Sequence, residues 1–219
     1  MRTKVRPFLR IEEFLHSLTH GAGALLGCLF TYLLYNRCMQ MNITFGYPLI
    51  IYGVSIILLY LCSFTYHFSC YLTDLENPPP ITEFTARFDH CAIFLLIIGT
   101  YFPPCINNFP KPLGYVIIGI VGACSVIGII LNSINVDRFA KISLALYIIS
   151  GWTIGLAIVP FINYVGVKGF VYLLLGGVSY TVGIIFYKMK RVPYMHVIWH
   201  LFVLLGTFFH FLMIYNCCL

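Results

Sequence analysis

Two histidines, His196 and His200, stand four residues apart at the start of the last apolar stretch of the chain. Positions i and i+4 of an α-helix lie on one face, so both imidazoles can point at one atom. Alone, this spacing is more typical of a packed polar patch than of a metal site. The pair becomes informative through the ionisable residues expected at the same depth in the molecule.

Two other apolar stretches carry polar residues at the matching end. Ser63 and His67, again four residues apart, close one stretch, and Asp89 and His90 open the next. Ionisable groups inside membrane spans are costly, face the interior of the bundle and usually mark function. We therefore expect these side chains to meet near one face of the membrane.

Three neutral imidazoles with one open position form the usual catalytic zinc site. We expect His67, His196 and His200 to bind a zinc ion. Asp89 would hold the water on that metal and accept its proton. Ser63, one turn before His67, would donate a hydrogen bond to a developing oxyanion or to a ligand.

Each residue also has a structural interpretation that the sequence leaves open. His67 can be an interfacial polar residue, and Asp89 can pair with Arg87 or cap its helix. His90 points about 100° away from its neighbour on a helix, which disfavours it as a ligand. His210 lies about 15 Å beyond the first pair of histidines along the same helix, and we expect a core histidine bonded to a neighbouring helix.

A further pair with the same spacing, His16 and His20, lies in an amphipathic lead-in to the first apolar stretch. Direct ligation, support of the ligands and a purely structural role all remain open for this pair. Glu12 and Glu13 precede them, and either pair with Arg10 or form a polar cap over the site.

The composition indicates an integral membrane protein. Of the 219 residues, 60% are hydrophobic and only 9% charged, with a mean hydropathy of +0.92, and no soluble domain has that balance. Apolar runs of about 18–22 residues match the roughly 30 Å thickness of a bilayer core. Seven such runs predict an all-α, seven-transmembrane-helix bundle at 17–35, 47–66, 84–101, 113–131, 139–159, 169–187 and 196–215. Pro-rich segments at 73–80 and 103–104 and Pro160 are expected to end helices.

Positive charge sets the orientation, because Lys and Arg concentrate on the cytoplasmic side of membrane proteins. Ten of the 13 fall on one side, namely Arg2, Lys4, Arg6, Arg10, Arg87, Arg138, Lys141, Lys188, Lys190 and Arg191. The other three are Arg37, Lys111 and Lys168. We expect a cytoplasmic N-terminus and an outside C-terminus, with residues 1–16 as a cytoplasmic basic segment and 17–219 as the membrane domain. No cleavable signal peptide is expected. The basic residues cluster at helix ends, which is not typical of a protein that binds nucleic acid.

Nine cysteines are scattered without C-x-x-C spacing, which argues against a cysteine-based zinc or redox site. Four fall inside apolar runs and are expected to be small buried side chains: Cys28, Cys62, Cys91 and Cys124. Four others would share one side of the membrane, and a disulfide among them stays open: Cys38, Cys105, Cys217 and Cys218.

In the stretches that carry the histidines and Asp89, the sequence resembles the hemolysin III family, the microbial branch of the progestin and adipoQ (adiponectin) receptor family. The resemblance is carried by EEFLHSLTHG at 12–21, SFTYH at 63–67, RFDHCAIFLLIIGTY at 87–101 and PYMHVIWHLFVLLG at 193–206. It implies seven helices with a cytoplasmic N-terminus. It also implies zinc on the histidines that match His67, His196 and His200, with an aspartate at Asp89 on the zinc-bound water and a serine nearby at Ser63.

The chain departs from this family in three places. His16 stands where relatives often carry Asn, the loop at 73–83 is acidic and Pro-rich where many relatives are basic, and the long N-terminal domain of the animal receptors has no counterpart here. A hormone-receptor role is therefore not expected.

Related receptors and alkaline ceramidases suggest hydrolysis of a lipid amide, so we expect an intramembrane zinc-dependent hydrolase of a lipid amide or ester in the cell membrane. One alternative is a zinc-stabilised sensor or regulator of membrane lipid state. Another is a lytic pore, because microbial members are named for lysing red cells. Membrane lipids are the expected partners in each case, and the sequence names no soluble partner.

Overall fold

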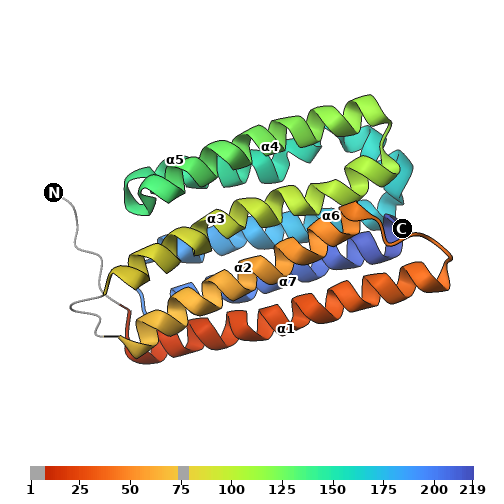
Figure 1. Ribbon diagram of the computed structural model, residues 1–219. Coiled ribbons are helices and arrows are strands. Elements are labelled where there is room, and N and C mark those ends of the chain that lie inside the picture. The colour runs from red at the N-terminus through yellow and green to blue at the C-terminus, as the bar shows by residue number, and fades with distance from the viewer. Residues whose placement is uncertain (1–7, 74–78) are drawn as a thin grey trace.

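The computed structural model describes residues 8–73 and 79–219, and the regular elements in those ranges are all helical (Figure 1). In chain order they are α1 (Arg10–Gln40), α2 (Tyr47–Leu72), α3 (Pro80–Pro103), η1 (Pro104–Asn108), α4 (Lys111–Ile134), α5 (Val136–Trp152), η2 (Thr153–Ala157), α6 (Ile158–Lys188) and α7 (Met195–Cys217). The prediction of an all-α protein is confirmed. The basic residues Arg2, Lys4 and Arg6 and most of the predicted Pro-rich loop lie outside the described residues.

The helices are apolar on the outside as well as inside, as expected for a bundle surrounded by lipid. Large hydrophobic side chains stay exposed along their length, with Leu25 at 74% and Leu156 at 76%. Six helical stretches of the described chain are long and apolar enough to cross a membrane. The protein is therefore a multi-pass membrane protein.

One of these six stretches, residues 136–188, contains both the fifth and the sixth predicted spans. The predicted helix end near Pro160 is wrong, because α5 already ends at Trp152 and Pro160 is the third residue of α6, where a missing N–H costs no helical hydrogen bond. The backbone breaks again at Gly166, with φ 75° and ψ 170°. Glycine adopts this conformation without the steric cost that a Cβ would bring.

Other helix ends follow the predictions more closely. α3 begins at Pro80 and ends at Pro103, where a short π-type helix, η1, continues the chain. The lead-in and the predicted first span are one continuous helix, since α1 already begins at Arg10. Consequently Glu12, Glu13 and His16 lie on the same rigid element as the apolar span.

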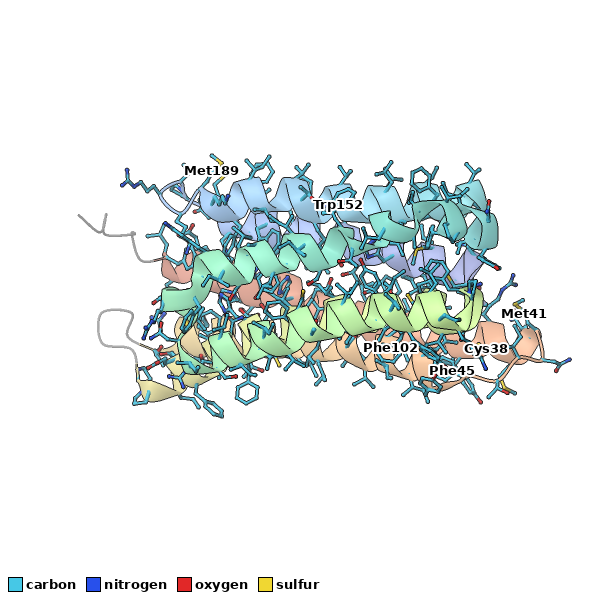
Figure 2. The ribbon with its side chains drawn as sticks, turned by 90° about the horizontal axis from the view of Figure 1, so that it is seen from above. Cys38, Met41, Phe45, Phe102, Trp152 and Met189 are labelled. Carbon is cyan, nitrogen blue, oxygen red and sulfur yellow. The ribbon has the colours of Figure 1, made fainter. Side chains whose placement is uncertain are left out.

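The helices run side by side, and α1 packs against both α2 and α7 (Figure 1). Glycine permits a close approach of α1 to α2, because a Cβ built at Gly23 would lie 2.6 Å from Cδ1 of Tyr60. Figure 2 shows Met189 at one end of the bundle and Cys38 and Met41 at the other. All nine cysteines are free thiols, so the structure contains no disulfide.

Candidate metal centre

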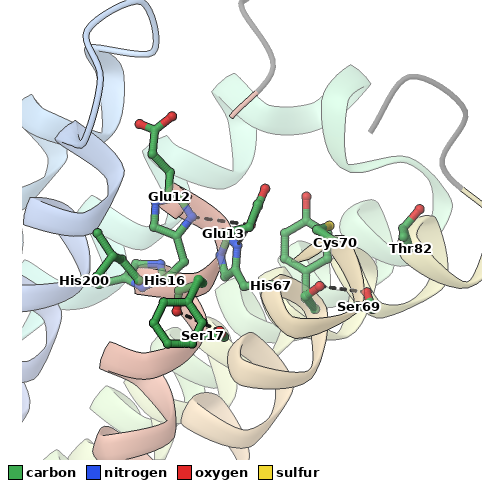
Figure 3. A network of polar contacts seen from close by, with 12 residues as sticks. Glu12, Glu13, His16, Ser17, His67, Ser69, Cys70, Thr82 and His200 are labelled. Atoms are coloured by element: carbon green, nitrogen blue, oxygen red, sulfur yellow. Dashed lines mark hydrogen bonds and ion pairs between the residues drawn. The ribbon is translucent and has the colours of Figure 1, made fainter. Parts of the chain in front are cut away.

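Five of the seven histidines gather where α1, α2 and α7 meet, at the end of the bundle where α1 and α7 begin. Figure 3 shows three of them, His16, His67 and His200. α1 provides His16 and His20, α2 provides His67, and α7 provides His196 and His200. The four-residue spacing places each pair on one helix face. The predicted convergence of histidines from separate spans is therefore present in the structure.

The three predicted metal ligands form a compact group. One ligand atom from each of His67, His196 and His200 lies within 4.8 Å of the other two. His67 and His200 are each only 1% exposed, whereas His196 is half-buried. Three imidazoles at this spacing, drawn from two helices, match the ligand set of an open zinc site.

A carboxylate holds His67 in place. Oε2 of Glu13 lies 2.6 Å from Nδ1 of His67 (Figure 3), and because a carboxylate only accepts hydrogen bonds, Nδ1 is the protonated nitrogen. Nε2 of His67 then carries the free lone pair, and it is buried with no hydrogen-bond partner among the described residues. Metal-binding histidines usually have their second nitrogen fixed by such a carboxylate.

His200 is oriented in the same way by Thr19. The single hydroxyl proton of Thr19 faces the carbonyl groups of Leu15 and His16, each 2.9 Å away. Its oxygen therefore accepts from Nδ1 of His200 at 3.1 Å. This leaves Nε2 of His200 free to bind. The orphaned nitrogen of His67 and the free nitrogen of His200 together fit a metal ion that prefers imidazole, as zinc does.

Glu12 fastens the start of α7 to α1. Its Oε1 accepts the backbone N–H of Tyr194 at 2.6 Å, and its Oε2 accepts that of Leu9 at 2.7 Å. Tyr194 caps α7 in the left-handed conformation, φ 64°. Arg10 instead donates to the carbonyl of Tyr71, while Glu12 bonds the starts of α1 and α7 and Glu13 bonds His67.

Asp89 and Ser63 lie along a cavity of about 600 Å³ that His67, His196 and His200 also line. Asp89 neither pairs with Arg87 nor caps its helix, because Arg87 forms an ion pair with Glu83 at 2.6 Å and Asp89 is the tenth residue of α3. Ser63 is buried beside the cavity. The cavity continues to apolar side chains deeper in the bundle, including Phe161 and Met213. It therefore places predicted catalytic groups, ligands and an apolar chamber in one space.

The remaining histidines differ in their surroundings. His90 lines the cavity, with Nδ1 2.9 Å from the carbonyl oxygen of Ala86 in its own helix. His210 lies 3.4 Å from the carbonyl of Leu173 in α6, as predicted for a core histidine. His20 stacks on His200, with ring centres 3.6 Å apart.

The sequence indicated the histidine trio but not the hydrogen bonds that Glu13 and Thr19 make to His67 and His200. Glu13 lies three residues before His16, which is helical spacing, and Thr19 lies three residues after His16. Acidic residues are common in the first turn of a helix because they interact favourably with the helix dipole. This general explanation gives no reason to expect that Glu13 also accepts a hydrogen bond from another helix. The useful signal was the presence of Glu13 on the same helix face as His16 and His20.

Known proteins match the chain over nearly its whole length. A family model described as "Haemolysin-III related" matches residues 8–211, which include every residue of the site. The "Hemolysin-3" protein of Bacillus cereus is 38% identical over 206 residues, or 94% of this chain and 90% of that protein. The "Hemolysin-3 homolog" of Bacillus subtilis (strain 168) is 35% identical over 199 residues, or 90% of this chain and 89% of that protein.

Proposed function

Since the chain belongs to the haemolysin-III related family, and since its histidines converge beside an apolar cavity, we propose that it binds zinc and hydrolyses a lipid amide or ester. His67, His196 and His200 would hold the metal. The observation that carries the proposal is the compact ligand trio, with the buried Nε2 of His67 unpartnered, on the wall of the same cavity as Asp89 and Ser63.

Three side chains along the cavity would each have a separate role in the reaction. When bound, zinc supplies a Lewis acid that polarises a carbonyl and activates water. The carboxylate of Asp89 accepts a proton from the attacking water and returns it to the leaving group. The hydroxyl of Ser63 donates a hydrogen bond to the developing oxyanion. Glu13 keeps the Nδ1 proton of His67 in place, so Nε2 stays available as a ligand.

Membrane lipids suit the cavity as substrates. Its volume of about 600 Å³ and its apolar inner residues match the size and character of a small-molecule site that takes an acyl chain. The charged side chains that line the cavity belong to helix ends on the side that carries the histidines, and the deeper lining adds neutral polar groups such as Thr100 and Tyr180. A head group and its amide or ester bond would lie at the charged end. This arrangement supports a substrate that enters with its polar end at the metal.

We further propose seven crossings with a cytoplasmic N-terminus, in the cell membrane. The stretch 136–188 has 53 residues, which as helix is about 80 Å, far more than the roughly 30 Å of one crossing. The backbone break at Gly166 supports a reversal there. With the excess of Lys and Arg on one side, this topology puts the metal centre near the cytoplasmic face.

A zinc-stabilised regulator of lipid state is the second candidate. The trio joins α2 to α7, and Glu13 and Thr19 of α1 bond two of its members. A metal at this point would tie three helices together and so control their packing. In that case removal of the metal would loosen the bundle without loss of any turnover.

A lipid-release assay tests the hydrolase. The purified protein, reconstituted in liposomes that carry either an N-acyl lipid or the corresponding ester, is expected to release fatty acid, measured by mass spectrometry. Release is expected to stop in His200→Ala. A preparation that holds zinc but releases no fatty acid from either lipid would contradict hydrolysis and leave the regulator.

A further inference from the structure

His16 occupies an unusual place beside the proposed trio. Its ring is fully buried, and its Nε2 has no hydrogen-bond partner among the described residues. The ring centre lies 4.6 Å from that of His67, 4.8 Å from that of His196 and 5.2 Å from that of His200. One imidazole thus touches all three proposed ligands.

The four ring centres form a nearly regular tetrahedron. Within the trio, the centres lie 5.4 Å apart for His67 and His196, 5.0 Å for His67 and His200, and 4.7 Å for His196 and His200. With a Zn–N bond of about 2.0–2.1 Å and about 1.2 Å from nitrogen to ring centre, four imidazoles around one zinc ion give an edge of about 5.2 Å. All six distances in the structure lie between 4.6 and 5.4 Å.

From this geometry we propose that His16 is a fourth protein ligand of the metal. The inference rests on the proposed zinc site and deepens it, because it assigns the coordination position that the trio leaves open. The metal would be held by four imidazoles from three helices. In a site with four protein ligands, an added anion has no position to bind unless one ligand leaves.

The present orientation of the His16 ring is only weakly held. Its Nδ1 is 3.4 Å from Oε2 of Glu13, near the limit of a hydrogen bond, whereas His67 makes the 2.6 Å contact with the same oxygen. The ligand atom of His16 presently belongs to a group with Glu13 and His67, which overlaps the trio through His67. A turn of the ring about its Cβ–Cγ bond exchanges the nitrogen and carbon positions while the ring centre stays in place.

His20 does not meet the same conditions, although it is also buried and both of its nitrogens lack partners among the described residues. Its ring is parallel to that of His200, at 9° and 3.6 Å, and its other ring contact is Tyr60. A stacked ring presents its face, and its nitrogens point away from the neighbour's lone pairs. His20 therefore provides a matched control on the same helix.

The proposal changes how the hydrolase would work. With His16 bound, the metal has no free position, and hydrolysis requires His16 to turn away toward Glu13. In that orientation the His16 ring contacts Glu13, as it does in the group of Glu13, His16 and His67. His16 would then act as a displaceable ligand that keeps the site closed until a lipid enters.

Cobalt substitution tests this inference directly. The full-length protein in detergent is stripped of metal, loaded with Co²⁺ and titrated with azide, for the wild type, His16→Asn and His20→Asn. We expect one cobalt per chain in each, and a visible spectrum that azide leaves unchanged in the wild type and in His20→Asn. His16→Asn is expected to shift its spectrum with azide, and to bind cobalt more weakly by at least the about 10–100-fold that loss of a supporting partner costs.

Two results would overturn the assignment of His16. One is a wild-type spectrum that responds to azide as strongly as His16→Asn does. The other is two cobalt ions per wild-type chain and one in His16→Asn, which would indicate a separate second metal on Glu13 and His16. Either result leaves the proposed zinc site on the trio intact, whereas a folded wild type that binds no cobalt would remove the site itself.

Discussion

Nδ1 of His67 on α2 lies 2.6 Å from Oε2 of Glu13 on α1, and this buried contact joins the two helices at the candidate metal centre. It fixes which nitrogen of His67 faces inward. It also gives α1 a direct influence on a histidine that α2 carries.

Loss of the Glu13 carboxylate should weaken metal binding. Glu13→Ala removes the acceptor that holds His67, and we expect zinc affinity to fall about 10–100-fold, with a smaller loss in Glu13→Gln because the amide oxygen still accepts the Nδ1 proton. Competition with a chromogenic chelator measures the affinity. Glu83→Gln, which alters an exposed pair with Arg87, is the control expected to bind like the wild type. Equal affinity in all variants would show that Glu13 does not position His67.

Glu12 should matter for stability even without metal. Glu12→Ala leaves the backbone N–H groups of Tyr194 and Leu9 without their acceptor, and we expect a loss of about 1–3 kcal/mol in the free energy of unfolding. Thermal denaturation of the metal-stripped protein in detergent measures this. Amide exchange at Tyr194 should speed up in the variant. Unchanged exchange there would contradict the anchoring of α7 by Glu12.

The close approach of α1 and α2 should make Gly23 intolerant of a side chain. A Cβ at this position would lie 2.6 Å from Tyr60 and 2.9 Å from Leu204. We expect Gly23→Ala to cost about 1–3 kcal/mol of stability. Gly119→Ala is the matched control, since a Cβ there meets nothing within 4 Å and alanine favours helix. Equal denaturation temperatures for the two variants would refute the tight contact.

Substitutions of Asp89 and Ser63 should lower hydrolysis without loss of the metal. Asp89→Asn should keep zinc and lower fatty-acid release by about 100-fold or more, because the amide cannot accept the proton. Ser63→Ala should lower release by about 100-fold through loss of the oxyanion donor. Ser69→Ala, on the same helix and bonded to the carbonyl of Tyr66, is the control. Full activity in Asp89→Asn would remove Asp89 from the mechanism.

The sequence was enough to predict the helical membrane class and the convergence of the histidines. Apolar runs report burial in lipid directly, and the i, i+4 spacing of His196 and His200 fixes one helix face. The basic residues at the ends of the runs then suggest which ends share a membrane side. Together they put His67 at the same membrane depth as His196 and His200, although the sequence does not show how the helices pack.

What the sequence could not give depends on contacts between helices. The bond of Glu13 to His67 and that of Thr19 to His200 require the relative rotation of α1, α2 and α7, which no local pattern encodes. Pro160 was expected to end a helix, yet a proline at the third helical position costs nothing, and the breaks fall after Trp152 and at Gly166. The place of His16 among three other rings likewise emerges only from the assembled bundle.

Metal content tests the central claim most directly. The detergent-purified protein is analysed by elemental mass spectrometry, beside His67→Ala, His196→Ala, His200→Ala and the control His210→Asn, a half-buried histidine outside the trio. We predict about one zinc per chain in the wild type and in His210→Asn, and loss of most of it in each of the other three, as expected when a metal-binding side chain is removed. A well-folded wild type without zinc, or zinc retained in all three variants, would contradict a metal centre on His67, His196 and His200.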